Sequence, residues 1–166
     1  FDEVLQYAQS QSWGTATGIA SLTSPSCPPH FVVTFIEVEV DTRTGEVKVV
    51  KAIQGADVGT PIHPGSVRGQ LLGGLHMGLG YALTETLIYD KRDGRILNPN
   101  FIDYKLLTPV DMPKVETFLT DSYEPTGPFG AKGIGEGAMN PVPAAVFNAV
   151  ANALGVRIFS SPITPE

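Results

Sequence analysis

The sequence predicts an α+β fold, in which an antiparallel, hairpin-rich sheet is accompanied by two long helices. Two stretches that alternate apolar and charged residues, 34–41 and 46–52, are separated by a short turn, which predicts an antiparallel hairpin. Two apolar stretches of helical length follow at 67–87 and 140–154. Because strands and helices do not alternate in regular βαβ units, a mixed arrangement is expected.

The first 29 residues are expected to form an arm in front of the main body. Residues 1–11 suit a helix, whereas residues 13–29 are rich in Gly, Ser, Thr and Pro, which predicts a loop. Residues 30–166 are expected to hold the sheet, both long helices and the site. With 166 residues and 42% hydrophobic content, the chain is long enough for one core, so a single domain is predicted.

The stretch from Val67 to Leu87 predicts a buried helix with an unusual number of glycines. Each glycine costs about 1 kcal/mol relative to Ala inside a helix, so some neighbour must require a surface without side chains. Close packing of another helix or sheet is one interpretation, and approach of a bulky cofactor to the N-terminal end is the alternative. The glycines are Gly69, Gly73, Gly74, Gly78 and Gly80.

The remaining elements are a turn, a short strand and a final helix. Residues 88–94 suggest a second turn, and residues 114–120 alternate as a strand does. Asn140 is a suitable N-cap, prolines 141 and 143 suit a first helical turn, and an apolar stripe continues until Gly155. The last helix is therefore predicted to begin after Asn140 and to end before Gly155.

Composition excludes several classes of function. The net charge of −6, with Lys and Arg dispersed, argues against nucleic-acid binding. Cys27 is the only cysteine, so neither an intrachain disulfide nor a Cys-rich metal site can form from this chain alone, and a cytoplasmic location is expected. The first residues, Phe1 to Val4, lack the basic start and apolar run typical of a signal peptide, and no apolar run in these residues is long enough to span a membrane, so a soluble chain is expected. It lacks an initiator Met, which suggests a piece of a longer protein.

The stretch from Gly127 to Gly137 is a glycine-dense loop just before the final helix, and it carries Lys132 and Glu136. In such a loop, consecutive amides can converge on an anion, with Lys132 adding a full charge. One interpretation makes Glu136 a carboxylate that stabilises a helix N-terminus. The other makes it a general base beside a bound ligand. Spacing alone does not choose between them.

Other glycine-loop and nucleophile motifs do not fit. A dinucleotide fingerprint needs a strand directly before the glycines, but two prolines precede them, and a Walker loop needs Ser or Thr after Lys132. No nucleophile elbow is present, and the three histidines, His30, His63 and His76, lack a zinc-binding spacing.

Several blocks, in order, resemble the molybdenum-binding subunit of the xanthine dehydrogenase and aldehyde oxidase family, in its C-terminal part. The loop 130–136 is similar to the family's active-site loop, and the stretch 69–85 resembles its glycine-rich helix after a glutamine. Further likenesses are Asp57-Val58-Gly59, Ile62-His63-Pro64, Leu97-Asn98-Pro99, Asp103-Tyr104-Lys105 and the ending 161–166. The departures are His63, where the family commonly has Asn, and Gly137, where eukaryotic members have Pro.

This resemblance implies a molybdenum hydroxylase that oxidises a purine, a nicotinate-like heterocycle or an aldehyde with water as oxygen source, with Glu136 as the catalytic base. It implies that Gly69, Gln70 and the backbone of Lys132, Gly133, Ile134 and Gly135 hold molybdopterin, in the cytosine dinucleotide form, and that no residue of this chain ligates molybdenum.

The expected partners are the N-terminal half of the same subunit, which closes the pocket, and iron–sulfur and FAD subunits or domains, which remove electrons. The isolated piece is expected to be inactive. The alternatives are a non-catalytic assembly or cofactor-carrier module on the same scaffold, and an unrelated small-molecule binding domain. The substrate is not determined by these residues.

Overall fold

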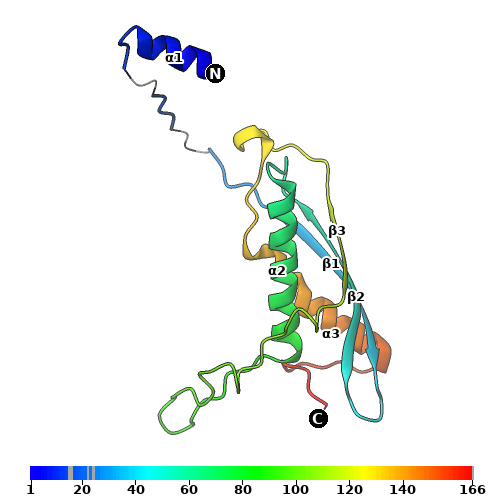
Figure 1. The fold of residues 1–166 in the computed structure, drawn as a ribbon. Helices are drawn as coiled ribbons and strands as arrows, with labels where there is room; N and C mark the ends of the chain where they lie inside the picture. Colours follow the sequence, from blue (N-terminus) through cyan, green and yellow to red (C-terminus); the bar gives the residue numbers. More distant parts are fainter. Residues whose placement is uncertain (15–16, 22, 24, 166) are drawn as a thin grey trace.

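The computed structural model describes residues 1–14, 17–21, 23 and 25–165. Helices α2 and α3 pack against each other and against the sheet, as Figure 1 shows. This confirms the predicted α+β class. The elements in chain order are α1 (Asp2–Ser10), β1 (Phe31–Val40), β2 (Val47–Asp57), α2 (Pro64–Leu83), β3 (Lys114–Leu119), the 3-10 helices η1 (Pro128–Gly130) and η2 (Glu136–Ala138), and α3 (Pro141–Leu154).

The sheet has the strand order β1-β2-β3 and is mixed in direction. β1 and β2 form the predicted antiparallel hairpin, closed by a turn in which Gly45 has a φ of +78°. β3 instead pairs in parallel with β2, after a crossover that contains α2. The sequence predicts a hairpin-rich antiparallel sheet, so this parallel pairing differs from the prediction. The alternating pattern of residues 114–120 predicts a strand, but whether that strand pairs in parallel or antiparallel depends on the crossover that precedes it.

β2 extends five residues beyond the end of the predicted strand, since it continues to Asp57. The alternating pattern ends at Ala52, and a glycine such as Gly55 is more typical of a loop than of a strand interior. Gly55 lies within the strand because its missing side chain leaves room for the ring of Phe118 on β3, which would lie 2.1 Å from a Cβ at this position. The extension carries Asp57 to the end of the sheet nearest the 127–137 loop.

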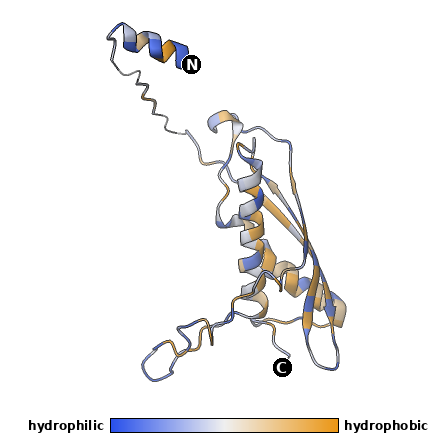
Figure 2. Cartoon of the chain, viewed as in Figure 1, coloured by the Kyte–Doolittle hydropathy of each residue, from blue (hydrophilic) through white to orange (hydrophobic). Residues whose placement is uncertain are grey.

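Apolar side chains fill the space between the sheet and the two long helices in two groups. Figure 2 shows apolar residues along β1, β2, α2 and α3. Gln54 is fully buried between Ala52 and Ala56, which belong to different groups. The larger group is Ala52, Leu75, Leu79, Ala82, Val142, Val146, Val150 and Ile163, and the smaller is Ala56, Val58, Val67, Leu71 and Ala138.

Helix α2 begins three residues earlier and ends four residues earlier than predicted. His63 caps it, since its Nδ1 accepts a hydrogen bond from the amide of Ser66 at 2.9 Å, and Pro64 takes the first position. Gly74 and Gly78 face inward, where an added Cβ would lie 2.6 Å from Ala138 and 2.4 Å from Val142. For these two glycines, the close-packing interpretation is confirmed.

The outward side of α2 is different. Gly69 and Gly73 are exposed, and an added Cβ would meet nothing within 4 Å among the described residues. Close packing explains Gly74 and Gly78 but does not explain Gly69 and Gly73. These two glycines leave helix backbone exposed on the surface.

Both terminal helices match their predictions. α3 ends before Gly155, which has a φ of +73°, and Asn140 is its N-cap residue although its side chain makes no capping hydrogen bond. α1 has no buried residue and stands apart from the body in Figure 1. The predicted 13–29 loop contains no helix or strand where it is described; residues 15, 16, 22 and 24 lie outside the description. Among the described residues, no helix is long and apolar enough to cross a membrane.

Candidate functional site

The glycine-dense loop is fastened to the end of β2 by backbone pairing, along a segment we call the strap (residues 130–132). Gly59 and Ala131 form an antiparallel bridge. The amide of Lys132 donates to the carbonyl of Val58, and the amide of Thr60 to that of Gly130, both at 2.7 Å. Gly59 has a φ of +62°, and a Cβ there would lie 2.2 Å from the carbonyl oxygen of Gly130. The close approach of residues 58–60 to the strap therefore requires glycine at position 59.

A partly buried ion pair reinforces the strap. Nζ of Lys132 lies 2.8 Å from Oδ2 of Asp57, with side chains only 10% and 24% exposed. The hydrogen bond from Lys132, then those from Ser122 and the amide of Gly59, hold the pKa of Asp57 well below its usual range. The ammonium also lies 5.3 Å from the ring centroid of Phe31, a cation–π contact.

This pair corrects one interpretation of the sequence, in which Lys132 adds a free positive charge for an anion. Its ammonium is neutralised by Asp57, and its amide is bonded to Val58. Spacing within the loop could not reveal a partner 75 residues away. Lys132 therefore holds the loop in place, and its positive charge is already paired.

Three consecutive amides beyond the strap have no hydrogen-bond partner among the residues that the structure describes. In the described part of the chain, the N–H groups of Gly133, Ile134 and Gly135 take part in no hydrogen bond. Gly133 and Gly135 are exposed, and an added Cβ at either would project into open space. Unpaired amides on glycines can approach a ligand closely and favour anionic or carbonyl oxygens.

A cleft of about 300 Å³ lies beside these amides, between the end of β2 and the first two turns of α2. It brings together Gln70, Lys132 and Ile134, three of the residues predicted for cofactor binding. Gln70 is exposed, and its carboxamide has no hydrogen-bond partner among the described residues. Gly69, Gly133 and Gly135 adjoin the lining residues in sequence but do not line the cleft themselves. The full lining is Val58, Thr60, Pro61, Ile62, His63, Ser66, Val67, Gln70, Ala131, Lys132 and Ile134.

Glu136 opens η2, two residues beyond Ile134, and its side chain is exposed. It does not line the cleft. η2 and residues 139–140 lie between the loop and α3, so Glu136 is in the first turn of η2 and outside the first turn of α3.

Although Glu136 is exposed, the turn that carries it is held from three sides. Gly74 of α2 packs directly on Ala138, and His30 lies against Gly137, where an added Cβ would be 1.8 Å from its Nε2. The amide of Gln54 on β2 donates to the carbonyl of Ala138 at 2.6 Å. A larger residue than glycine at position 137 would have to displace the ring of His30.

Sequence analysis missed Asp57, His30 and Gln54 as parts of this site. One signal for Gln54 was available: it stands in the inward-facing row of β2 between Ala52 and Ala56, so a polar group was placed where the strand buries its residues. No comparable signal existed for Asp57 or His30, whose partners become neighbours only in the folded chain.

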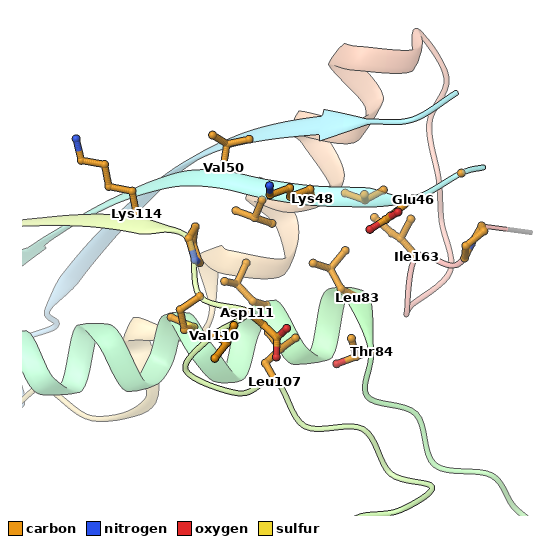
Figure 3. A pocket seen from close by; sticks show the side chains of 17 residues that line it. Glu46, Lys48, Val50, Leu83, Thr84, Leu107, Val110, Asp111, Lys114 and Ile163 are labelled. Carbon is orange, nitrogen blue, oxygen red and sulfur yellow. The ribbon is translucent and has the colours of Figure 1, made fainter. Parts of the chain in front are cut away.

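A larger hollow, of about 760 Å³, lies at the other end of the molecule and contains none of the predicted site residues. Figure 3 shows Leu83 of α2 and Leu107 of the following segment below Glu46 and Lys48 of the hairpin.

The other histidines serve local structure: His63 caps α2, and Nε2 of His76 is bonded to the carbonyl of Leu107. In the described residues, no three His, Cys, Asp or Glu side chains group as metal ligands.

The chain is similar to known proteins over most of its length. The family model of the molybdopterin cofactor-binding domain matches residues 5–113. The xanthine dehydrogenase molybdenum-binding subunit of Escherichia coli O157:H7 is 37% identical over 153 residues, which cover 92% of this chain and 20% of that protein. The aldehyde oxidoreductase molybdenum-binding subunit PaoC of Escherichia coli (strain K12) is 39% identical over 131 residues, 78% of this chain and 18% of that protein.

Solved structures agree with the sequence relatives. Quinoline 2-oxidoreductase from Pseudomonas putida 86 superposes with a TM-score of 0.71 at 37% identity, over 77% of this chain and 16% of that one. The chain thus spans about a fifth of the length of the curated relatives it matches. The match of a family model to most of the chain, together with relatives of this identity, shows that the chain belongs to the molybdopterin cofactor-binding domain family of the xanthine dehydrogenase and aldehyde oxidoreductase type.

Proposed function

We propose that this chain is the part of a molybdenum hydroxylase that holds molybdopterin through Gln70 and the amides of residues 133–135, and that presents Glu136 as the general base. The observation that carries the proposal is the group of three unpaired amides beside the cleft, followed directly by a carboxylate on a turn held from three sides. The substrate is a purine, a nicotinate-like heterocycle or an aldehyde.

The residues present fit such a cofactor. The amides of Gly133, Ile134 and Gly135 offer donors without competing intramolecular acceptors, and the open space above the two glycines admits a bulky group. Gln70 adds a free carboxamide from α2. Molybdopterin is rich in oxygen and nitrogen acceptors, so this donor set matches its chemistry, and the cytosine dinucleotide form is part of the proposal.

The roles of the protein groups follow from their chemistry. The bound cofactor supplies activation of water as the oxygen source and accepts the electrons that leave the substrate. Glu136 would take up the proton of that water at a carboxylate oxygen, and it stands on the turn that directly follows the three amides. The strap, fixed by Lys132 and Asp57, sets how far the amides stand from α2.

The remaining components belong to the rest of the enzyme. Glu136, Gln70 and the unpaired amides all lie on the surface of this chain, so another part of the same subunit must cover them to exclude water. Iron–sulfur and FAD subunits or domains are proposed to carry the electrons onward. The chain alone is therefore proposed to be inactive.

The test uses the complete enzyme that contains this chain, assayed with a panel of purines, N-heterocycles and aldehydes. Glu136→Gln removes the base but keeps the size of the side chain, and kcat is expected to fall by at least about 100-fold at unchanged molybdenum content. Glu39→Gln, on the exposed side of β1, is the matched control and should retain wild-type turnover. Full turnover in Glu136→Gln would refute the proposal.

The same experiment addresses the cofactor-carrier alternative. A wild-type complex that contains stoichiometric molybdenum, yet oxidises no member of the panel, would favour a carrier role over catalysis.

A further inference from the structure

Gln54 is a polar side chain in an otherwise apolar row. It is fully buried on the inward face of β2, between Ala52 and Ala56. Its Nε2 donates to the carbonyl of Ala138 at 2.6 Å and to Oγ1 of Thr34 on β1 at 3.1 Å. The amide group therefore joins both strands of the hairpin to η2.

The other end of the same amide has no partner. Oε1 of Gln54 is buried and accepts no hydrogen bond from any described residue. A buried acceptor without a donor destabilises a protein, and an apolar side chain of the same length would avoid that cost. The unpaired Oε1 costs stability and the two hydrogen bonds from Nε2 oppose that cost, so the useful end of the side chain is the donor end that contacts Ala138.

The contact matters because of what η2 carries. Ala138 is the last residue of the three-residue turn that Glu136 begins. The contacts with Gly74 and His30 limit how closely the turn approaches its neighbours, but they are non-directional. The hydrogen bond from Gln54 is directional, and it fixes the orientation of the Ala138 carbonyl relative to the sheet.

We propose that Gln54 is a positioning residue, whose amide orients the η2 turn through the carbonyl of Ala138 and thereby sets the direction of the Glu136 carboxylate. The proposal rests on the proposed function of Glu136. Gln54 touches neither substrate nor cofactor. Its effect reaches the reaction only through the turn.

The test compares Gln54→Met, which keeps the length of the side chain but removes both donors and the orphan acceptor, with Thr34→Val, which removes only the bond to β1. Both are made in the complete enzyme. In Gln54→Met, amide hydrogen exchange in the peptide 136–140 should become at least about tenfold faster, while exchange in the body of α3 is unchanged. Its kcat should fall about 10- to 100-fold with KM within about twofold of wild type, because misplacement of a catalytic group affects the chemical step. Thr34→Val should change neither.

Two results would overturn the positioning role: unchanged exchange at 136–140 in Gln54→Met, or faster exchange with an unchanged kcat. If Gln54→Met does not assemble, Gln54→Asn replaces it, since its amide is one methylene shorter and withdraws from Ala138. Glu136→Gln is assayed in parallel. Full turnover in Glu136→Gln defeats the proposed function itself, whereas its loss alongside a wild-type Gln54→Met defeats only the positioning role.

Discussion

The ion pair between Asp57 and Lys132 is predicted to anchor the strap, and a double-mutant cycle measures how strongly. Asp57→Asn keeps the acceptor Oδ1 that Ser122 and the amide of Gly59 use, but replaces the oxygen that faces Lys132. Lys132→Met removes the charge and retains the apolar stem over Phe31. The double variant closes the cycle, so that the coupling between the two charges is isolated from their other contacts.

The expected coupling follows from the geometry. Two unit charges about 4 Å apart interact by about 4 kcal/mol at an effective dielectric constant of about 20. The N–O distance here is 2.8 Å, but the Asp57 side chain is 24% exposed and is screened accordingly. A charge-assisted hydrogen bond in such a setting contributes about 1.5–3 kcal/mol.

The assay is hydrogen exchange at the two strap amides, those of Thr60 and Lys132, in the complete subunit. Where exchange reports the opening equilibrium, each single variant should exchange about 10- to 150-fold faster than wild type. The exposed pair Lys51–Glu116 on the neighbouring strands serves as the control cycle, and its coupling should be much smaller and disappear in high salt. Equal couplings for the two pairs, or loss of the Asp57–Lys132 coupling in high salt, would refute the reasoning.

Three further predictions concern the same region. Because the pKa of Asp57 is lower in the folded than in the unfolded protein, ionised Asp57 stabilises the fold fully above its unfolded pKa. The difference in melting temperature between wild type and Asp57→Asn should therefore stay constant above about pH 5 and shrink as the pH falls below about 4. A difference that stays constant down to about pH 2 would contradict this. Gly59→Ala should destabilise the subunit by at least about 2 kcal/mol in urea unfolding, since it combines a positive φ with a clash against the Gly130 carbonyl. Gly74→Ala gains about 1 kcal/mol of helix propensity but overpacks against Ala138 by about 1–3 kcal/mol, so a net loss is expected in the same measurement, and a clear gain would show that the contact is loose.

Local sequence patterns predicted the elements of this fold well, but not the ends that depend on distant partners. The period-two pattern of 34–41 and the cap and stop signals around α3 are local, and both elements were found. The predicted strand is shorter than β2 because a glycine such as Gly55 is typical of a loop. Only the ring of Phe118, 63 residues further along, makes a glycine suitable inside that strand.

The candidate site shows the same division. The glycine density of residues 127–137 indicates an exposed backbone, and the amides of residues 133–135 donate to no described residue. The role of Lys132 was misjudged because its partner Asp57 belongs to another strand. Gln54 was overlooked although a polar residue in a buried row is a visible signal. Catalysis by Glu136 remains a prediction, since it depends on groups outside this chain.

The glycines of α2 have a mechanical consequence. Gly74 faces the turn that bears Glu136, and Gly73 faces outward, so at this level the helix is bare on two sides. At this level, little more than the helix backbone, about 5 Å across at its Cα atoms, lies between the surface at Gly73 and the turn that Gly74 contacts. A group that contacts α2 at Gly73 would therefore lie directly on helix backbone, with no side chain between them to change rotamer, and the next residue of the same backbone, Gly74, packs on the turn.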